Sequence, residues 1–194
     1  READVAVTDG KYLYALSGSY NAGSSIRILE ASGASTRVVS SIQLGDGGSN
    51  GSTAVNGSFY YGDNPQLYIV GDRLVLITQA YKNAAQPRTA DGAATGDMYY
   101  VQPGESTTCI AVFDVSDREN PIYVNSLAQS GGLLSTRVID NYLYTVSRHW
   151  VYDEAQRDQP QTYVPSTYVG EAQGHVLSAS DLCLLPQPAS AEYV

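Results

Sequence analysis

The chain has 194 residues, enough for one domain of ordinary size or two small ones, and its hydrophobic content of 43% predicts a packed core. It carries 11 basic and 20 acidic side chains, so its formal net charge of −9 argues against nucleic acid or an anionic membrane surface as a partner. No apolar run is long enough to span a bilayer as a helix, and two Cys exclude a four-Cys zinc site.

Nine short runs rich in Tyr, Val, Ile and Thr, bounded by Gly, Asn, Asp and Pro, are typical of β-strands. In chain order these runs cover residues 12–16, 25–29, 38–44, 66–70, 73–78, 107–115, 122–127, 135–139 and 142–146. No window shows the spacing of apolar residues that an amphipathic helix requires. The chain is therefore predicted to be all-β.

One motif occurs three times: a turn pair, a bulky residue, a Leu, a bulky strand former and a closing Ser or Thr. The copies cover 10–17, 71–78 and 140–147, and each follows another strand, which predicts three tight hairpins. We expect the second strand of each hairpin to lie second in its unit, with equivalent, buried positions for Leu13, Leu74 and Leu143.

The first two copies are each followed by two more predicted strands, so the repeating unit is a four-stranded antiparallel meander. Such a unit, repeated at a long and variable period, is the signature of a β-propeller. A two-sheet sandwich is the alternative, but its strands would not repeat as hairpin-plus-hairpin quartets.

Four segments carry a resemblance to a known family, and they occur in its order: 2–14, 67–75, 112–117 followed by Pro121, and 136–144. They resemble the hairpins, outer strand and turn of the secreted β-propeller-domain family of bacteria and archaea, distantly related to WD-repeat propellers. Val7 departs from the basic residue that the family favours, and the turn at 140–141 departs from its Gly-Asp. The resemblance implies a secreted or cell-surface propeller, with a signal peptide upstream of Arg1, and it transfers no catalytic residue.

The resemblance also implies an incomplete propeller of about two and a half blades, because closure usually needs at least about four. We expect a partial domain over 1–194, with blade one at 1–44, blade two at 66–128 and the start of blade three at 134–194. The open sheet edges of such a chain invite self-association.

The meander places the tight turns on one face and the long connections 45–65, 80–106 and 149–192 on the other. Loops of this length are usually functional or disordered, and Tyr and Trp suit sugar rings or partner side chains. The candidate ligand-binding residues are Tyr99, Tyr100, His149, Trp150, Tyr152 and Tyr163. An equally supported interpretation is that these side chains only hold the loops in place by packing against the blades.

The leading hypothesis is a non-catalytic module that binds a protein or glycan partner. The alternatives are an extracellular hydrolase or lyase with its site at the channel mouth, and a rigid spacer beside another domain. A G-x-S-x-G pattern at 47–51 lacks the strand and helix of a nucleophile elbow, and His149 and His175 show no zinc spacing. No run of closely spaced carboxylates suits Ca²⁺, so we predict no catalytic residue, metal or cofactor.

Two further roles stay open. Arg137, inside a predicted strand, either contacts an anion in the channel or pairs with a carboxylate such as Asp4. Cys109 and Cys183 are expected near the same face of adjacent blades, which makes them a candidate disulfide if their Cα atoms approach within about 7 Å.

Overall fold

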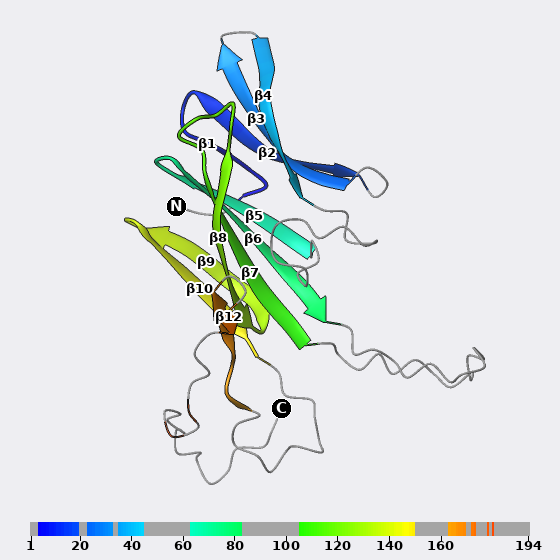
Figure 1. The fold of residues 1–194 in the computed structure, drawn as a ribbon, viewed down its shortest axis with the longest axis vertical. Coiled ribbons are helices and arrows are strands. Elements are labelled where there is room, and N and C mark those ends of the chain that lie inside the picture. Colours follow the sequence, from blue (N-terminus) through cyan, green and yellow to red (C-terminus); the bar gives the residue numbers. More distant parts are fainter. Residues whose placement is uncertain are drawn as a thin grey trace, which may run out of the picture.

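The computed structural model describes residues 4–19, 23–32, 35–44, 63–82, 105–149, 163–169, 172–173, 178 and 180. Its regular elements are antiparallel β-strands in successive layers (Figure 1), so the all-β prediction is confirmed. All nine predicted strands are present, most of them longer than the sequence indicated. None of the described residues forms a helix with the length and apolar character needed to cross a membrane.

Three sheet units follow one another along the chain. Blade one consists of β1 (Ala6–Thr8), β2 (Tyr12–Ser19), β3 (Gly23–Ser32) and β4 (Ser35–Leu44), which pair in that order. Blade two consists of β5 (Asp63–Val70), β6 (Arg73–Lys82), β7 (Glu105–Asp114) and β8 (Ile122–Ser130). The third unit is the hairpin of β9 (Gly132–Ile139) and β10 (Tyr142–Arg148). As predicted, β2, β6 and β10 lie second in their units.

Two short strands follow the third unit but extend the sheet of blade two. These are β11 (Thr167–Val169) and β12 (Ala172–Gln173), and the resulting order is β12-β11-β8-β7-β6-β5. Tyr168 of β11 lies opposite Ala128 of β8 and packs against Ala128 and Cys109. The sequence predicted that residues 134–194 form the start of blade three, whereas β11 and β12, which lie in this range, join the sheet of blade two.

The three predicted hairpins share one register, which confirms the repeat. Each has a two-residue turn whose first residue has a positive φ: 100° at Gly10, 58° at Gly71 and 54° at Asp140. The Leu of each motif therefore occupies the same position relative to its turn. A second shared feature is a bulge between the third and fourth strands, at 28/29 in blade one and 112/113 in blade two.

Blade two lies between blade one and the β9–β10 hairpin, with an apolar core on each side. The first core joins Tyr14, Ile26 and Ile28 of blade one to residues such as Leu67 and Leu74 of blade two. The second core joins the other face of blade two to the hairpin. The described part of the molecule is thus a stack of three sheets (Figure 1).

The prediction that all three motif Leu residues are buried is wrong for two of them. Leu74 is fully buried because it faces blade one, but Leu13 and Leu143 are only half-buried. Leu13 lies on the side of blade one that faces away from blade two. Leu143 packs at the margin of the second core, where the covering unit has only two described strands.

Candidate functional site

The described strands have two contrasting ends. At one end, which we call the tight-turn end, lie the hairpin turns at 10–11, 71–72 and 140–141 and the turn 115–121 between β7 and β8. At the other, the long-connection end, lie the strand ends Leu44, Lys82 and Arg148, from which the connections to the next described strands run (Figure 1). This arrangement follows from the alternating strand directions, as the sequence predicted.

Ser130 is the centre of a polar network at the long-connection end. Its N–H donates to the carbonyl of Ser166 (2.8 Å), and its Oγ accepts from the N–H of Ser166 (3.0 Å). Its carbonyl accepts from Oγ of Ser147 (2.9 Å), which in turn accepts from Nε2 of Gln129 (2.8 Å). The network ties the ends of β8 and β10 to the segment that enters β11, so this end has a fixed framework.

Gly131, the single residue between β8 and β9, lies in the same network. Its N–H donates to the carbonyl of Ser106 (2.7 Å), and its carbonyl accepts from the fully buried hydroxyl of Thr108 (2.9 Å). Its φ is +105°, and a Cβ at this position would lie 2.6 Å from the carbonyl carbon and oxygen of Arg148. Only glycine permits this close approach of the end of β10.

The structure places two of the six candidate ligand-binding residues. His149 follows β10 directly and is half-buried beside Gly131, and the side chain of Tyr163, just before β11, is exposed. Both therefore belong to the long-connection end, as predicted. The other four, Tyr99, Tyr100, Trp150 and Tyr152, lie outside the described residues.

The remaining sequence-based candidates are only partly placed. Cys109 is buried and packs against Ala128 and Tyr168 of the same sheet, with its Sγ 3.9 Å from the carbonyl of Thr107. Cys183 lies outside the described residues, so the disulfide stays a prediction. Arg137 lies on the exposed face of β9, opposite Tyr144. The carboxylate of Asp4 accepts from the N–H of Val5 (2.7 Å). Both interpretations of Arg137 stay predictions.

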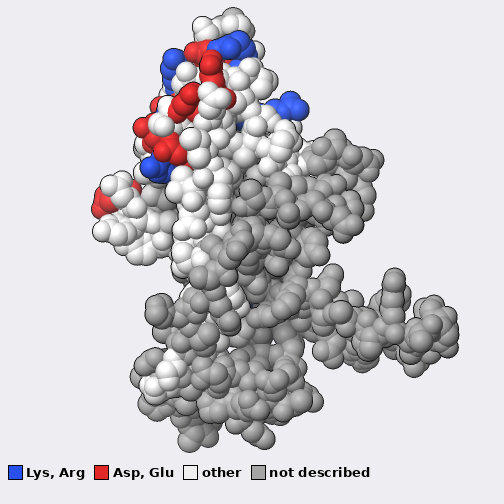
Figure 2. All heavy atoms as spheres, in the orientation of Figure 1, with Lys and Arg blue, Asp and Glu red and all other residues white. Residues whose placement is uncertain are grey.

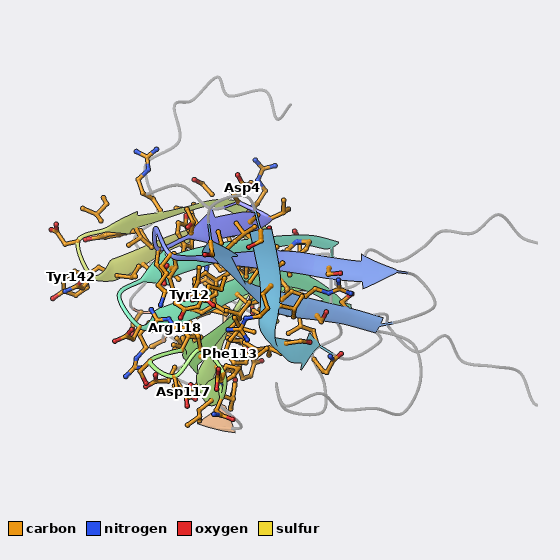
Figure 3. The ribbon with its side chains drawn as sticks, turned by 90° about the horizontal axis from the view of Figure 1, so that it is seen from above. Asp4, Tyr12, Phe113, Asp117, Arg118 and Tyr142 are labelled. Carbon is orange, nitrogen blue, oxygen red and sulfur yellow. The ribbon has the colours of Figure 1, made fainter. Side chains whose placement is uncertain are left out.

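The strongest electrostatic cluster lies at the other end and was missed by the sequence analysis. Arg118, in the turn between β7 and β8, donates to Oδ2 of Asp9 (3.0 Å), Oδ1 of Asp72 (2.6 Å) and Oη of Tyr14 (3.1 Å). Its guanidinium also lies 5.6 Å from the ring centre of Tyr12 (Figure 3). We call these five residues the Arg118 cluster; it joins blade one to blade two.

The surroundings of the Arg118 cluster shift the pKa values of its ionisable side chains. Desolvation alone would raise the pKa of Asp9, but hydrogen bonds from the backbone of Tyr12 and Lys11 and from Tyr14 and Arg118 outweigh it and lower the pKa to about 2. Burial, reinforced by the hydrogen bond to Asp9, raises the pKa of Tyr14 to about 12. Desolvation works against the charge of Arg118, but its bonds to Asp72, Asp9 and Tyr14 raise its pKa overall. The ion pairs of the cluster therefore persist across the physiological range.

Other charges near the tight-turn end are also paired with one another. Glu30 binds Arg37 (2.9 Å) and Lys11 (3.5 Å), and Arg73 binds Asp114. Hydrogen bonds from Ser116, together with Arg73, lower the pKa of Asp114 to about 2. Figure 2 shows the charged side chains of this view gathered over blade one and the neighbouring turns. Each of these pairs lies within one blade, so among the ion pairs described only those of Arg118 connect blade two to blade one.

A signal for the Arg118 cluster was present in the sequence. The turns that carry Asp9, Asp72 and Arg118 were all predicted at one end, where opposite charges on neighbouring blades can meet. Within the ranges that the structure describes, no group of three or more His, Cys, Asp or Glu residues could hold a metal ion.

Comparison with known proteins gives one match. The family model described as Beta propeller domain matches residues 1–194, which includes both blades and the β9–β10 hairpin. No curated protein and no solved structure matches the chain. The match bears on the fold and names no ligand, partner or location.

Proposed function

This chain belongs to the Beta propeller domain family, and from that premise we propose that it is a non-catalytic module whose long-connection end binds a protein or glycan partner. The observation that carries the proposal is the contrast between the two ends. At the tight-turn end, the Arg118 cluster and the neighbouring ion pairs engage charged groups with one another. The long-connection end combines a fixed framework with the connections in which recognition residues usually lie.

The framework around Ser130 supports this role because it holds the strand ends from which the connections start. Gln129, Ser130, Ser147 and Ser166 are joined by direct hydrogen bonds of 2.8 to 3.0 Å. A binding surface on a rigid scaffold loses less conformational entropy on association than a surface with no fixed base. The exposed ring of Tyr163 adds an apolar face with a polar tip beside this framework.

The proposal includes a location outside the cytoplasm, at the cell surface or in the medium. Its support is the resemblance of the hairpin segments to secreted propellers. Fractionation of cells that produce the complete protein tests this point, and recovery in the cytoplasmic fraction alone would contradict it.

The test of binding compares variants at the two ends. Trp150→Ala, Tyr99→Ala and Tyr163→Ala change candidate binding residues that the sequence assigns to the long connections. Tyr142→Ala is the matched control, because Tyr142 is an exposed aromatic beside a tight turn. Each variant is checked for folding by circular dichroism and screened against glycan arrays and candidate surface proteins. We expect the first three to weaken binding by about tenfold or more each and the control to leave it unchanged.

Two outcomes would contradict the proposal. Binding that responds only to changes at the tight-turn end would place the site elsewhere. Turnover of a glycan or peptide during the same screen would favour the hydrolase or lyase alternative, and His149→Ala would then show whether the half-buried imidazole beside Gly131 takes part.

A further inference from the structure

The turn between β1 and β2 begins with the dipeptide Asp9-Gly10, which is chemically reactive. The backbone nitrogen of a glycine that follows an aspartate can attack the side-chain carboxyl carbon, because glycine has no side chain to hinder the approach. The chain has two other Asp-Gly pairs, at 46–47 and 91–92, and both lie outside the described residues. The other two tight turns read Gly-Asp and Asp-Asn. Asp9-Gly10 is therefore the pair whose surroundings the structure shows.

The reaction of this pair isomerises the main chain. The nitrogen of Gly10 forms a bond to Cγ of Asp9, and its proton leaves with the carboxyl hydroxyl as one molecule of water, which gives a cyclic succinimide. A second water then adds its hydroxyl to the main-chain carbonyl carbon of Asp9 and its proton to the nitrogen, and the bond between these two atoms breaks. The product is isoaspartate. One water leaves and one is taken up, so no other reactant is needed.

The structure holds both oxygens of the reacting carboxyl group. Oδ1 of Asp9 accepts from the N–H groups of Lys11 (3.0 Å) and Tyr12 (2.8 Å). Oδ2 accepts from Oη of Tyr14 (2.9 Å) and from Nη2 of Arg118 (3.0 Å). Each oxygen therefore has two donors, and the one that leaves as water must first give up both of its hydrogen bonds.

The charge of the carboxyl group opposes the reaction as well, because only the neutral group loses its hydroxyl readily. Desolvation would raise the pKa of Asp9, but the hydrogen bonds outweigh it and lower the pKa from 3.8 to about 2. At a given pH the neutral form is therefore rarer by more than about tenfold. The attacking group is held too, since the N–H of Gly10 donates to Oγ1 of Thr8 (3.0 Å).

The four donors of Asp9 come from two blades. Lys11, Tyr12 and Tyr14 belong to the same hairpin as Asp9, whereas Arg118 belongs to the turn between β7 and β8 of blade two. Arg118 also donates to Oη of Tyr14 (3.1 Å), and it lies beside Tyr12 (Figure 3). It is the only charged donor of the four, so a large part of the protection depends on the contact between blades one and two.

We propose that Arg118 suppresses isomerisation of Asp9-Gly10, so that this pair becomes an isoaspartate site when blade two separates from blade one. The product lengthens the main chain by one carbon atom beside the paired residues Thr8 and Leu13. It also attaches the free carboxylate directly to Cα, away from the position that Arg118 reaches. Isomerisation therefore makes an opening of this junction permanent. The proposal does not rest on the proposed ligand binding.

Peptide mapping of the 194-residue chain, kept at neutral pH and sampled over weeks, tests the proposal. Electron-transfer fragmentation of the digest distinguishes isoaspartate from aspartate at each position. Arg118→Met should raise the rate at Asp9 by at least about tenfold, because loss of a neighbouring Arg raises the pKa of a carboxyl group by one unit or more. The pairs at 46–47 and 91–92 serve as references in the same digest, and Arg118→Met should leave their rates unchanged.

Two control variants separate this effect from a general loss of charge or stability. Arg37→Met removes an exposed cation that pairs with Glu30 and should not change the rate at Asp9. Gly131→Ala destabilises the chain through a collision with Arg148 at the other end and leaves all four donors of Asp9 in place. Urea is added so that Arg118→Met and Gly131→Ala have the same unfolded fraction. The rate at Asp9 should then remain higher in Arg118→Met.

Tyr14→Phe keeps the proposal testable if Arg118→Met does not fold. This variant retains the ring in the first core and removes only the hydroxyl that donates to Asp9. It should raise the rate at Asp9 severalfold, because Oδ2 then has one donor instead of two.

Three results would overturn the proposal. The first is a rate at Asp9 in the folded chain that equals the rate in the urea-unfolded chain. The second is an equal rate in Arg118→Met and Gly131→Ala at the same unfolded fraction, which would assign the protection to global stability alone. The third is purified isoaspartate-9 protein with the same urea midpoint as the unaltered chain, which would show that the junction closes again after isomerisation.

Discussion

Arg118 connects groups from two blades through one planar side chain. Its guanidinium contacts Asp9 and Tyr14 of blade one and Asp72 of blade two, and its carbonyl accepts from Oγ of Ser40 (2.6 Å). Arg suits this position because its donors form a fixed fork that can serve several acceptors at once. The side chain is only 18% exposed, so its bonds are less screened by water than those of a surface ion pair.

Arg118→Met should therefore lower the free energy of unfolding by about 2–4 kcal/mol, because it leaves the carboxylate of Asp9 and the hydroxyl of Tyr14 without a partner from blade two. Urea denaturation gives the measurement. The matched control is Arg37→Met, which removes an exposed pair with Glu30 and should have little effect. Equal effects of the two variants would contradict the role assigned to Arg118.

Asp140 is the only non-glycine residue with a positive φ in the part of the chain that the structure describes. It occupies the turn position that Gly10 and Gly71 hold in the other two hairpins. Asp140→Gly should raise the free energy of unfolding by about 0.5 kcal/mol, since glycine adopts this conformation without steric cost. Asn141→Gly, at the next position, should lower it slightly through backbone entropy. Chemical denaturation that ranks the two variants the other way would be inconsistent with the described turn.

The three hairpins have the same register but differ in burial, so substitutions of their motif Leu residues should differ in their effect on stability. Leu74→Ala should cost about 2–5 kcal/mol because it opens a cavity between blades one and two. Leu13→Ala and Leu143→Ala should cost clearly less, since both side chains are half-exposed. Thermal or urea unfolding of the three variants gives the order. A Leu13→Ala effect as large as that of Leu74→Ala would indicate that the outer side of blade one is covered in solution.

The junction between β8 and β9 depends on close backbone contact. Two glycines with similar φ, one at this junction and one in an open turn, allow the effect of that contact to be measured separately from backbone strain. Gly131 and Gly10 have nearly the same φ, +105° and +100°, but only Gly131 has atoms within 4 Å of an added Cβ. Gly10→Ala should cost about 1–2 kcal/mol through backbone strain alone. Gly131→Ala should cost more, because the methyl group also collides with the carbonyl of Arg148. Equal losses of stability would show that β10 can shift away at no cost.

The strands were predictable because their information is local. Alternating side chains and turn residues placed all nine predicted strands and the register of the hairpins at Gly10, Gly71 and Asp140. The pairing of β11 with β8 was not predictable: it rests on three residues, and its partner lies about forty positions earlier in the chain. The burial of Leu13 was predicted wrongly, because the alternation of side chains shows which face of a strand a residue occupies but not whether another sheet covers that face.

The candidate site, like the fold, was predictable from the sequence only in part. The sequence placed His149 and Tyr163 at the long-connection end because strand direction alone determines the end at which a connection lies. It did not find the network of Ser130, Ser147 and Ser166, because single Ser residues carry no periodic signal. Nor did it find the Arg118 cluster, whose partner Asp9 is 109 residues away in the chain.

At the scale of the whole molecule, the Arg118 cluster makes stability depend on pH at both extremes. The pKa of Asp9 is lowered from 3.8 to about 2, so its contribution is complete above about pH 4 and is lost as the pH falls toward 2. The pKa of Tyr14 is raised from 10.0 to about 12, so its contribution is complete below pH 10 and is lost as the pH rises toward 12.

Urea midpoints measured across both ranges test this dependence, with Tyr14→Phe as the informative variant. The variant has no ionisable phenol at this position, so its stability should decline less between pH 10 and 12 than that of the unaltered chain. It should still lose stability in acid, because Asp9 keeps its backbone bonds to Tyr12 and Lys11. An alkaline decline of the same size in both proteins would show that Tyr14 does not cause it.

The late position of β11 in the chain has a consequence during synthesis. Residues 167–169 pair with β8, whose last residue, Ser130, is 37 positions before Thr167. At a translation rate of roughly 5–20 residues per second, the growing chain carries an open β8 edge for about 2–7 s before β11 can cover it. In that interval neighbouring chains on one polysome could pair through β8, and the nascent chain would benefit from slow loading of ribosomes or from a chaperone at the exit tunnel.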